Sequence, residues 1–95
     1  MAYATPFSIP FQAPMSSAQV SWLREELGLT IHPKTAIADL PFAFGLLDRF
    51  SGFYLLKGEG DRWTLECRTY EEPTPEQVAS WRARAEWVVA ALPRR

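Results

Sequence analysis

The chain has 95 residues, of which 47% are hydrophobic, enough for one small domain with a core. Ten basic and eleven acidic side chains leave a net charge of −1, which disfavours duplex nucleic acid and anionic membranes as partners. No window reaches roughly 18 uninterrupted apolar residues, so we expect no membrane span. One cysteine excludes an intrachain disulfide, and no signal-peptide pattern is present. We therefore expect a cytoplasmic protein, or one delivered without cleavage.

Residues 1–14 are predicted to form an extended arm. Three proline–apolar pairs recur every four residues: Pro6-Phe7, Pro10-Phe11 and Pro14-Met15. Proline fixes φ and donates no backbone hydrogen bond, which favours an extended chain. Alternation then gives the arm an apolar edge, made by Phe7, Ile9 and Phe11.

Such an edge requires a groove on its own domain or on a neighbour, and we favour the neighbour. Met15 is also a plausible start residue, so residues 1–14 are alternatively an extension that some forms lack. Residues 15–95 are predicted to form a single domain.

A first helix is predicted to begin after Ser16. Ser16 and Gln19 have the spacing of a capping box, and Met15 and Val20 that of a hydrophobic staple. Gly28 supplies the stop. At about 100° per residue, one stripe of this helix is apolar and contains Val20, Leu23 and Leu27.

The middle of the chain is harder to assign. Residues 29–31 are predicted to form a short strand, and residues 35–40 are candidates for a helical turn. Pro41 suits the first turn of a second helix over residues 42–50. In that helix three apolar residues share one side: Phe42, Leu46 and Phe50.

A β-hairpin is predicted from two β-rich runs, 53–57 and 62–70, around the turn residues 58–61. Pairing Lys57 with Arg62 gives one apolar face of Tyr54, Leu56, Trp63, Leu65 and Cys67. The other face is half polar and contains Phe53, Leu55, Thr64, Glu66, Arg68 and Tyr70. A lone hairpin is scarcely stable, so it needs a third strand or a cover, for which the arm is a candidate.

The last helix is predicted to begin at Thr74, with Pro75 in its first turn and Gln77 completing a capping box. Its core face contains Val78, Trp81, Ala85, Val88, Val89 and Leu92. The predicted fold is therefore a small two-layer α+β domain. Two or three helices pack on an antiparallel hairpin or short sheet, and an extended arm precedes them.

Trp87 lies roughly 180° from Val78 on the last helix. Around it are small residues, Ala79, Ala83, Ala90 and Ala91. This surface is either a second contact face for a partner or is covered by the protein's own chain, for instance by the arm. Exposure of Trp87 to solvent is the outcome that we expect least.

No motif predicts a catalytic, cofactor or metal site. Cys67 and His32 are candidates for a nucleophile and its base, but Cys67 alternates with apolar residues and is better explained as a small packed hydrophobe. One histidine and one cysteine match no zinc spacing. The acidic residues Glu71, Glu72 and Glu76 are explained by the start of the last helix.

The leading hypothesis is a non-enzymatic interaction protein: a small subunit, adaptor, inhibitor or assembly component. It would bind a protein partner or a second copy of itself through the arm and the Trp87 face. The candidate contact residues are Phe7, Ile9, Phe11, Trp22, Phe53, Tyr70, Ala83 and Trp87.

Two alternatives stay open. One is a small-ligand-binding or enzymatic domain with a pocket between residues 42–50 and the hairpin, lined by Tyr54, Trp63 and Tyr70; a concavity of ~300 Å³ or more would favour it. The other is a nucleic-acid-binding accessory protein that uses the arginines near the end of the chain. Arg82 and Arg84 are about 200° apart on their helix and so form no single stripe, which disfavours it.

Overall fold

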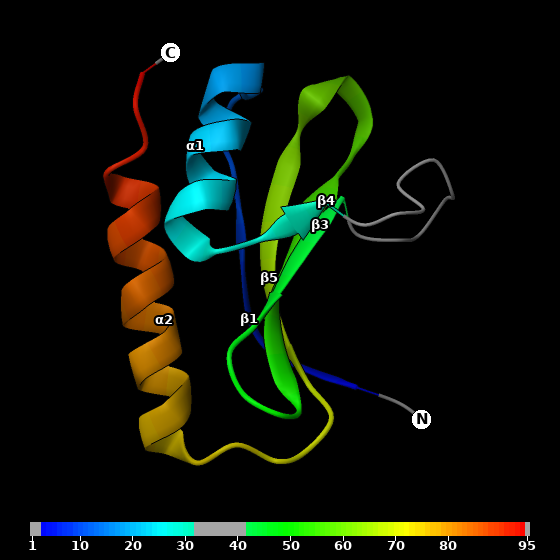
Figure 1. Cartoon of the computed structure of the whole chain (residues 1–95), viewed down its shortest axis with the longest axis vertical. Coiled ribbons are helices and arrows are strands. Elements are labelled where there is room, and N and C mark those ends of the chain that lie inside the picture. The colour runs from blue at the N-terminus through cyan, green and yellow to red at the C-terminus, as the bar shows by residue number, and fades with distance from the viewer. Residues whose placement is uncertain (1–2, 32–41, 95) are drawn as a thin grey trace.

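The computed structural model describes residues 3–31 and 42–94, in which five strands form one antiparallel sheet and two helices cover one of its faces (Figure 1). The elements are β1 (Ala4–Pro10), α1 (Ser17–Leu27), β2 (Thr30–Ile31), β3 (Ala43–Leu46), β4 (Ser51–Lys57), β5 (Trp63–Thr69) and α2 (Pro75–Ala90), with a 3-10 turn at Glu59–Asp61. The strand order is β1-β5-β4-β3-β2. The prediction of a small α+β domain with helices on a short antiparallel sheet is confirmed.

The N-terminal segment is a strand of the domain, and the predicted extended arm is not confirmed. Strand β1 pairs antiparallel with β5, so that Phe7 lies opposite Cys67. The side chain of Phe7 is 5% exposed, and its ring meets that of Phe53 edge-on with 6.3 Å between centroids. The apolar edge of this segment is therefore buried by its own chain.

The prolines of β1 suit its place at the edge of the sheet. An edge strand needs backbone donors on one side only, so it tolerates residues without an N–H group. The register with β5 shifts between Ala4 and Phe7, a bulge-like irregularity in the segment that contains Pro6.

Helix α1 has the predicted ends. The Ser16 hydroxyl accepts from the Gln19 backbone at 3.2 Å, and the Gln19 side chain accepts from the Ser16 backbone at 2.8 Å. Gly28 ends the helix in the left-handed region, with φ 65°. The Gln19 amide also donates to the Pro93 carbonyl oxygen at 2.6 Å, which ties the start of α1 to the segment after α2.

Helix α2 is likewise as predicted at its start, where Thr74 and Gln77 form a capping box. Its predicted core face is confirmed, because Ala85 and Val88 are buried. Four further side chains of this face are partly buried against the core: Val78, Trp81, Val89 and Leu92.

The prediction of a helix over residues 42–50 is wrong, because Ala43–Leu46 is a strand between β2 and β4. Gly45 gives the physical reason. A Cβ atom at this position would lie 2.7 Å from the Gly28 carbonyl oxygen, so the strand runs directly against the end of α1. Leu46, placed on the packed side of the predicted helix, is 75% exposed. The turn proposed at 35–40 lies outside the described residues.

The predicted register of the hairpin is wrong by one residue. Lys57 pairs with Trp63, and Leu55 with Leu65. The turn includes Arg62, whose carbonyl oxygen accepts from the Gly58 backbone at 2.6 Å. A slip of one residue exchanges the two faces of a strand. Consequently Phe53 and Leu55 face the core, in place of Tyr54 and Leu56.

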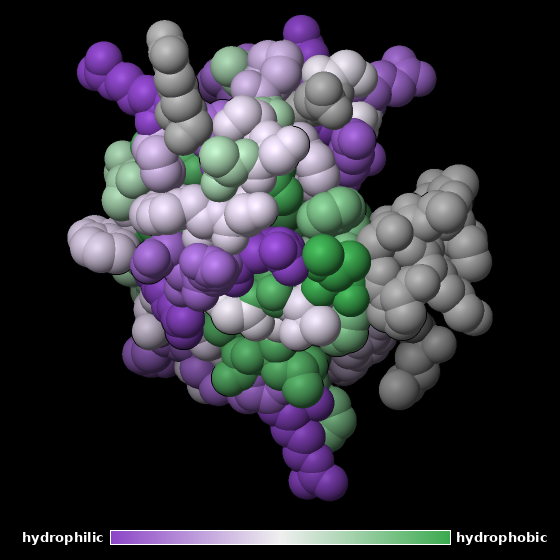
Figure 2. All heavy atoms as spheres, turned by 45° about the horizontal axis from the view of Figure 1, so that its top comes forward, coloured by the Kyte–Doolittle hydropathy of each residue, from purple (hydrophilic) through white to green (hydrophobic). Residues whose placement is uncertain are grey.

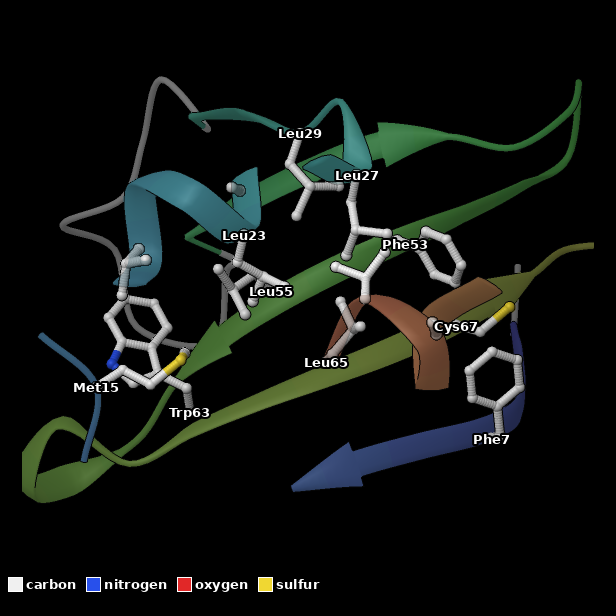
Figure 3. Close-up of a cluster of buried hydrophobic side chains, with 14 residues drawn as sticks. Phe7, Met15, Leu23, Leu27, Leu29, Phe53, Leu55, Trp63, Leu65 and Cys67 are labelled. Atoms are coloured by element: carbon white, nitrogen blue, oxygen red, sulfur yellow. The ribbon is translucent and has the colours of Figure 1, made fainter. Parts of the chain in front are cut away.

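The core lies between the helices and the inner face of the sheet (Figure 3). Its most enclosed side chains come from α1, β4 and β5, and they include Leu23, Phe53, Leu55 and Leu65. On the surface drawn in Figure 2, polar side chains cover much of the view, with apolar patches between them. The inner face of the sheet is thus buried against the two helices, whereas neither helix covers the opposite face.

Candidate functional site

The sheet face that points away from the helices is the candidate functional surface, here called the outer face. Side chains alternate along a strand, so the burial of Phe53 and Leu65 directs Tyr54 and Arg68 to the opposite side. The residues of this surface include Tyr3, Phe44, Leu46, Tyr54, Glu66, Arg68 and Tyr70. Antiparallel sheets with one solvated face usually carry polar side chains there. This one carries polar side chains and, in addition, the aromatic rings of Tyr3, Phe44, Tyr54 and Tyr70.

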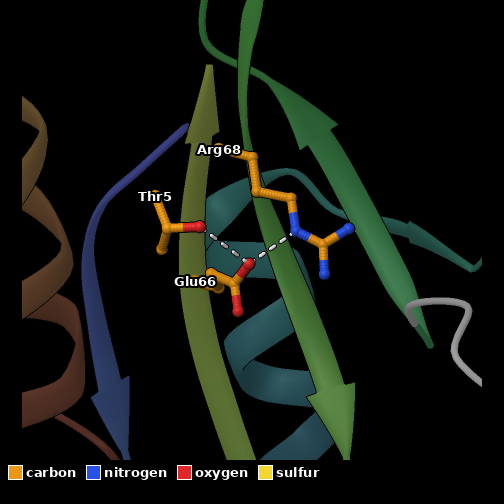
Figure 4. Close-up of polar contacts among 3 residues, drawn as sticks. All are labelled: Thr5, Glu66 and Arg68. Carbon is orange, nitrogen blue, oxygen red and sulfur yellow. Dashed lines mark hydrogen bonds and ion pairs between the residues drawn. The ribbon is translucent and has the colours of Figure 1, made fainter. Parts of the chain in front are cut away.

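An ion pair lies in the middle of the outer face. The Arg68 guanidinium donates from Nε to Oε1 of Glu66 at 2.6 Å, and the Thr5 hydroxyl donates to the same oxygen at 3.3 Å (Figure 4). The side chains of Arg68 and Glu66 are only 14% and 16% exposed. No helix of the described residues packs on this face, so their neighbours on the sheet must shield them.

Aromatic rings provide that shield. The Arg68 guanidinium carbon lies 4.5 Å from the ring centroid of Tyr3 and 4.7 Å from that of Tyr54. Phe44 stacks on Tyr54 with 6.2 Å between centroids, and Tyr70 meets Tyr3 edge-on at 6.0 Å. The result is a continuous row across three strands and the N-terminal segment, in the order Tyr70, Tyr3, Arg68, Tyr54, Phe44. Cation–π contacts hold its centre in place.

The electrostatics of the row keep its central phenol neutral. Burial raises the pKa of Tyr54, and the nearby phenols of Tyr70 and Tyr3 raise it further, while the Arg68 charge opposes them. A neutral phenol can donate a hydrogen bond and pack against an apolar surface.

Three side chains of the outer face are well exposed. Leu46 is 75% exposed, Tyr70 46% and Tyr3 45%. They extend the row with apolar area that is accessible to another molecule. Contiguous exposed apolar area rimmed by polar groups is typical of interaction sites.

The contact residues that the sequence predicted do not lie together on one surface of the structure. Phe7 and Phe53 lie in the core, 5% and 1% exposed, so their rings are not available to a partner. Three more are partly buried against the core: Ile9, Phe11 and Trp22. Only Tyr70 belongs to the outer face.

Trp87 and Ala83 are exposed on α2, away from the core. Trp87 is 69% exposed, so the suggestion that its own chain covers it is wrong. Trp87 is therefore exposed to solvent, which is the outcome that we expected least from the sequence.

Sequence reasoning missed Tyr3, Phe44, Leu46 and Tyr54 as members of one surface. The alternation that placed Glu66, Arg68 and Tyr70 on the outer face was correct. The same alternation on β4 would have added Tyr54, but only with the observed pairing of Lys57 with Trp63.

Cys67 has the environment of a packing residue. It is fully buried, and burial raises the pKa of its thiol to about 11, with smaller contributions from Asp48 and Glu66. A thiol with this pKa is protonated at neutral pH and is a poor nucleophile. His32, its candidate base, lies outside the described residues.

The described parts of the chain hold no group of three His, Cys, Asp or Glu side chains that could bind a metal ion. Across residues 3–31 and 42–94, no helix combines the length and the apolar composition that crossing a bilayer requires.

A cavity of about 300 Å³ lies at the far end of the sheet, between α1 and the hairpin. Its described lining residues are Met15, Ser17, Val20, Ser21, Arg24, Ile31, Phe42, Lys57 and Trp63. Its volume reaches the value expected for the ligand-binding alternative. Trp63 was predicted to line such a pocket, whereas Tyr54 and Tyr70 belong to the outer face instead.

The arginines of α2 are distant from the aromatic row, because α2 packs on the other side of the sheet (Figure 1). The Nε atom of Arg82 also lies 3.9 Å from Oε1 of Glu86, and this carboxylate partly neutralises the positive charge of Arg82. Proteins that bind single-stranded nucleic acid combine cations and stacking rings in one groove. Here the arginines of α2 and the aromatic row lie on different layers.

Comparison with protein-family models, with curated proteins and with solved structures found no match to this chain.

Proposed function

We propose that this chain is a non-enzymatic protein-interaction module that binds a protein partner through its outer face. The observation that carries the proposal is the aromatic row around the shielded Arg68–Glu66 pair. The centres of protein interfaces are enriched in Tyr, Phe and Arg, with charged residues otherwise depleted there. The aromatic row has this composition.

The row also suits binding because its side chains are already ordered. Arg68 is held by Glu66 and by two rings, and Tyr54 is held by Arg68 and Phe44. Side chains that are fixed before binding lose less conformational entropy in the complex. A partner therefore gains apolar contact with Leu46 and the rings at a low ordering cost.

The Trp87 face is a second docking surface in this proposal. A tryptophan that is 69% exposed beside Ala83 offers a large ring on a flat helical surface. The N-terminal segment contributes Tyr3 to the outer face and does not act as a free arm. The role is that of a small subunit, adaptor, inhibitor or assembly component of the cytoplasm, and a reduced, buried Cys67 suits that compartment.

Site-specific photocrosslinking in the producing cells tests the proposal. A benzophenone amino acid is placed at Leu46 on the outer face, at Trp87 on α2, or at Arg62 in the hairpin turn as the control. We expect an adduct of defined mass from position 46 and none from position 62. The mass distinguishes a second copy of the chain from a different protein.

A second substitution checks that the adduct reports docking. Tyr70→Ser removes an exposed ring of the outer face, and we expect it to reduce the adduct from position 46 several-fold. An adduct from position 87 alone would assign docking to the Trp87 face and contradict the outer-face proposal. Equal labelling from position 62 would show random collision and contradict docking at either surface.

A further inference from the structure

We infer that the cavity between α1 and the hairpin binds a small organic carboxylate, a molecule with one carboxylate head and a short apolar body. The cavity shares no residue with the outer face, so the inference does not depend on the proposed function. Lys57 and Trp63 border it at the turn end of the hairpin, whereas Tyr70 follows the opposite end of β5.

The polar part of the lining offers hydrogen-bond donors and positive charge. Ser17, Ser21 and Arg24 follow one another at helical spacing along a single side of α1, and Arg24 supplies the positive charge. No Asp or Glu is among the described lining residues, although the chain has eleven of them. Such a lining attracts an anion, and Arg in particular recognises a carboxylate by paired hydrogen bonds.

The rest of the lining is apolar. It includes Met15, Val20, Ile31, Phe42 and Trp63. The Phe42 ring stands edge-on to the Trp63 indole, with 5.0 Å between centroids. A bare inorganic anion would leave this surface without a partner, so the ligand needs an apolar body beside its charged head.

No described residue accepts a hydrogen bond from the indole N–H of Trp63. Its Nε1 atom is buried and has no hydrogen-bond partner among the described residues. Met15 lines the same cavity as Trp63, and both side chains are drawn in Figure 3. Methionine is flexible, so a ligand that displaces the thioether would gain access to the N–H group. An entering carboxylate oxygen would then accept a hydrogen bond that the described residues leave unmade.

Nuclear magnetic resonance of the ¹⁵N-labelled chain tests the inference, because each of the four tryptophans gives one indole signal. Trp63→Phe identifies the signal of Trp63. The probes are hexanoate, N-acetyl-leucine, hexanamide and inorganic phosphate. Hexanoate represents a free short-chain acid, and N-acetyl-leucine represents the C-terminus of a peptide. The probe that binds with the higher affinity shows which of these two kinds of molecule supplies the carboxylate.

We expect at least one carboxylate to shift the Trp63 indole signal saturably and downfield. Hexanamide has the same apolar body without the charge, and its affinity should be lower by about tenfold or more. Phosphate should give no saturable shift of this signal. Equal affinity for hexanoate and hexanamide, or no saturation with either carboxylate, would overturn the inference.

Two substitutions locate the binding. Arg24→Gln should weaken the carboxylate by about tenfold, while the matched control Arg84→Gln on α2 should leave its affinity unchanged. Ser21→Phe, at an exposed position of α1, should fill the cavity and abolish the shift. Unchanged affinity in both cavity variants would contradict the site. The crosslinks from Leu46 are measured in a separate experiment. A failure of carboxylate binding therefore does not affect the test of the outer face, and the reverse is also true.

Discussion

Cys67 and Tyr54 occupy opposite faces of the sheet, and burial acts on both. The pKa of each group is raised, because each charged form would lose hydration in the protein. For Cys67 the consequence is a loss of nucleophilic reactivity. For Tyr54 it is a phenol that stays neutral beside a cation.

The raised pKa of Cys67 predicts a loss of stability at alkaline pH. The folded thiol has a pKa of about 11 against an ordinary value of 9.0, so the unfolded chain releases its proton first as the pH rises. The contribution of the neutral thiol is complete below pH 9 and is lost between about 9 and 11. The loss should be on the order of 2–3 kcal/mol in the free energy of unfolding.

Urea denaturation at a series of pH values measures this effect. Cys67→Ala is the control, because it has no thiol to titrate although it loses some packing. Its stability should fall less steeply over the same pH window. Parallel pH profiles for the two proteins would show that another group causes the decline.

At the scale of elements, β3 is positioned by its contact with the end of α1. Gly45 passes so close to the Gly28 carbonyl oxygen that a side chain has no room, and a Cβ atom there would also lie 3.0 Å from the Leu29 side chain. The contact connects the helical layer to the strand next to β4. It therefore fixes where the outer-face residues Phe44 and Leu46 lie.

Gly45→Ala should destabilise the protein by about 2–3 kcal/mol, since the backbone on both sides must move. Gly60→Ala is the matched control. Gly60 has φ 66°, but a Cβ atom added there would meet no atom within 4 Å, so its cost is the backbone strain of about 1 kcal/mol. Urea unfolding of both variants makes the comparison. A milder effect at Gly45 than at Gly60 would contradict the close packing of β3 on α1.

The helices were predictable because their signals are local. Each capping box spans four consecutive residues, and Gly28 or Thr74 acts on its own helix end. Strand β3 was not predictable in this way. Its apolar residues have helical spacing, and only pairing with β4 and contact with Gly28 make it a strand.

The outer face was predictable in part for the same reason. Alternation along β5 places Glu66 and Arg68 together, but Tyr54 joins them only if the turn includes Arg62. Tyr3 joins them only once β1 is known to pair with β5 in the same chain. Both facts depend on contacts between distant residues.

At the scale of the whole molecule, β1 is a structural strand of the domain, whereas the sequence predicted an accessory arm. Phe7→Ala should lower the free energy of unfolding by about 3–5 kcal/mol, because it empties a buried site next to Phe53. Ser8→Ala, on the exposed side of the same strand, should change it by less than about 0.5 kcal/mol. Thermal or urea denaturation measures both. Equal stability of the Phe7 variant and the unaltered chain would indicate a free arm after all.

The position of β5 between β1 and β4 has a consequence for the newly made chain. Thr5 bonds to a residue that is synthesised 61 positions later, so at ribosomal speeds about 3 to 12 s separate the two. During that interval β1 has no strand to pair with, because β5 is its neighbour in the sheet and is also the last strand to be made. The apolar side of β1 is therefore accessible to other chains until β5 emerges. Emergence of β5 gives β1 its partner and ends this period of exposure.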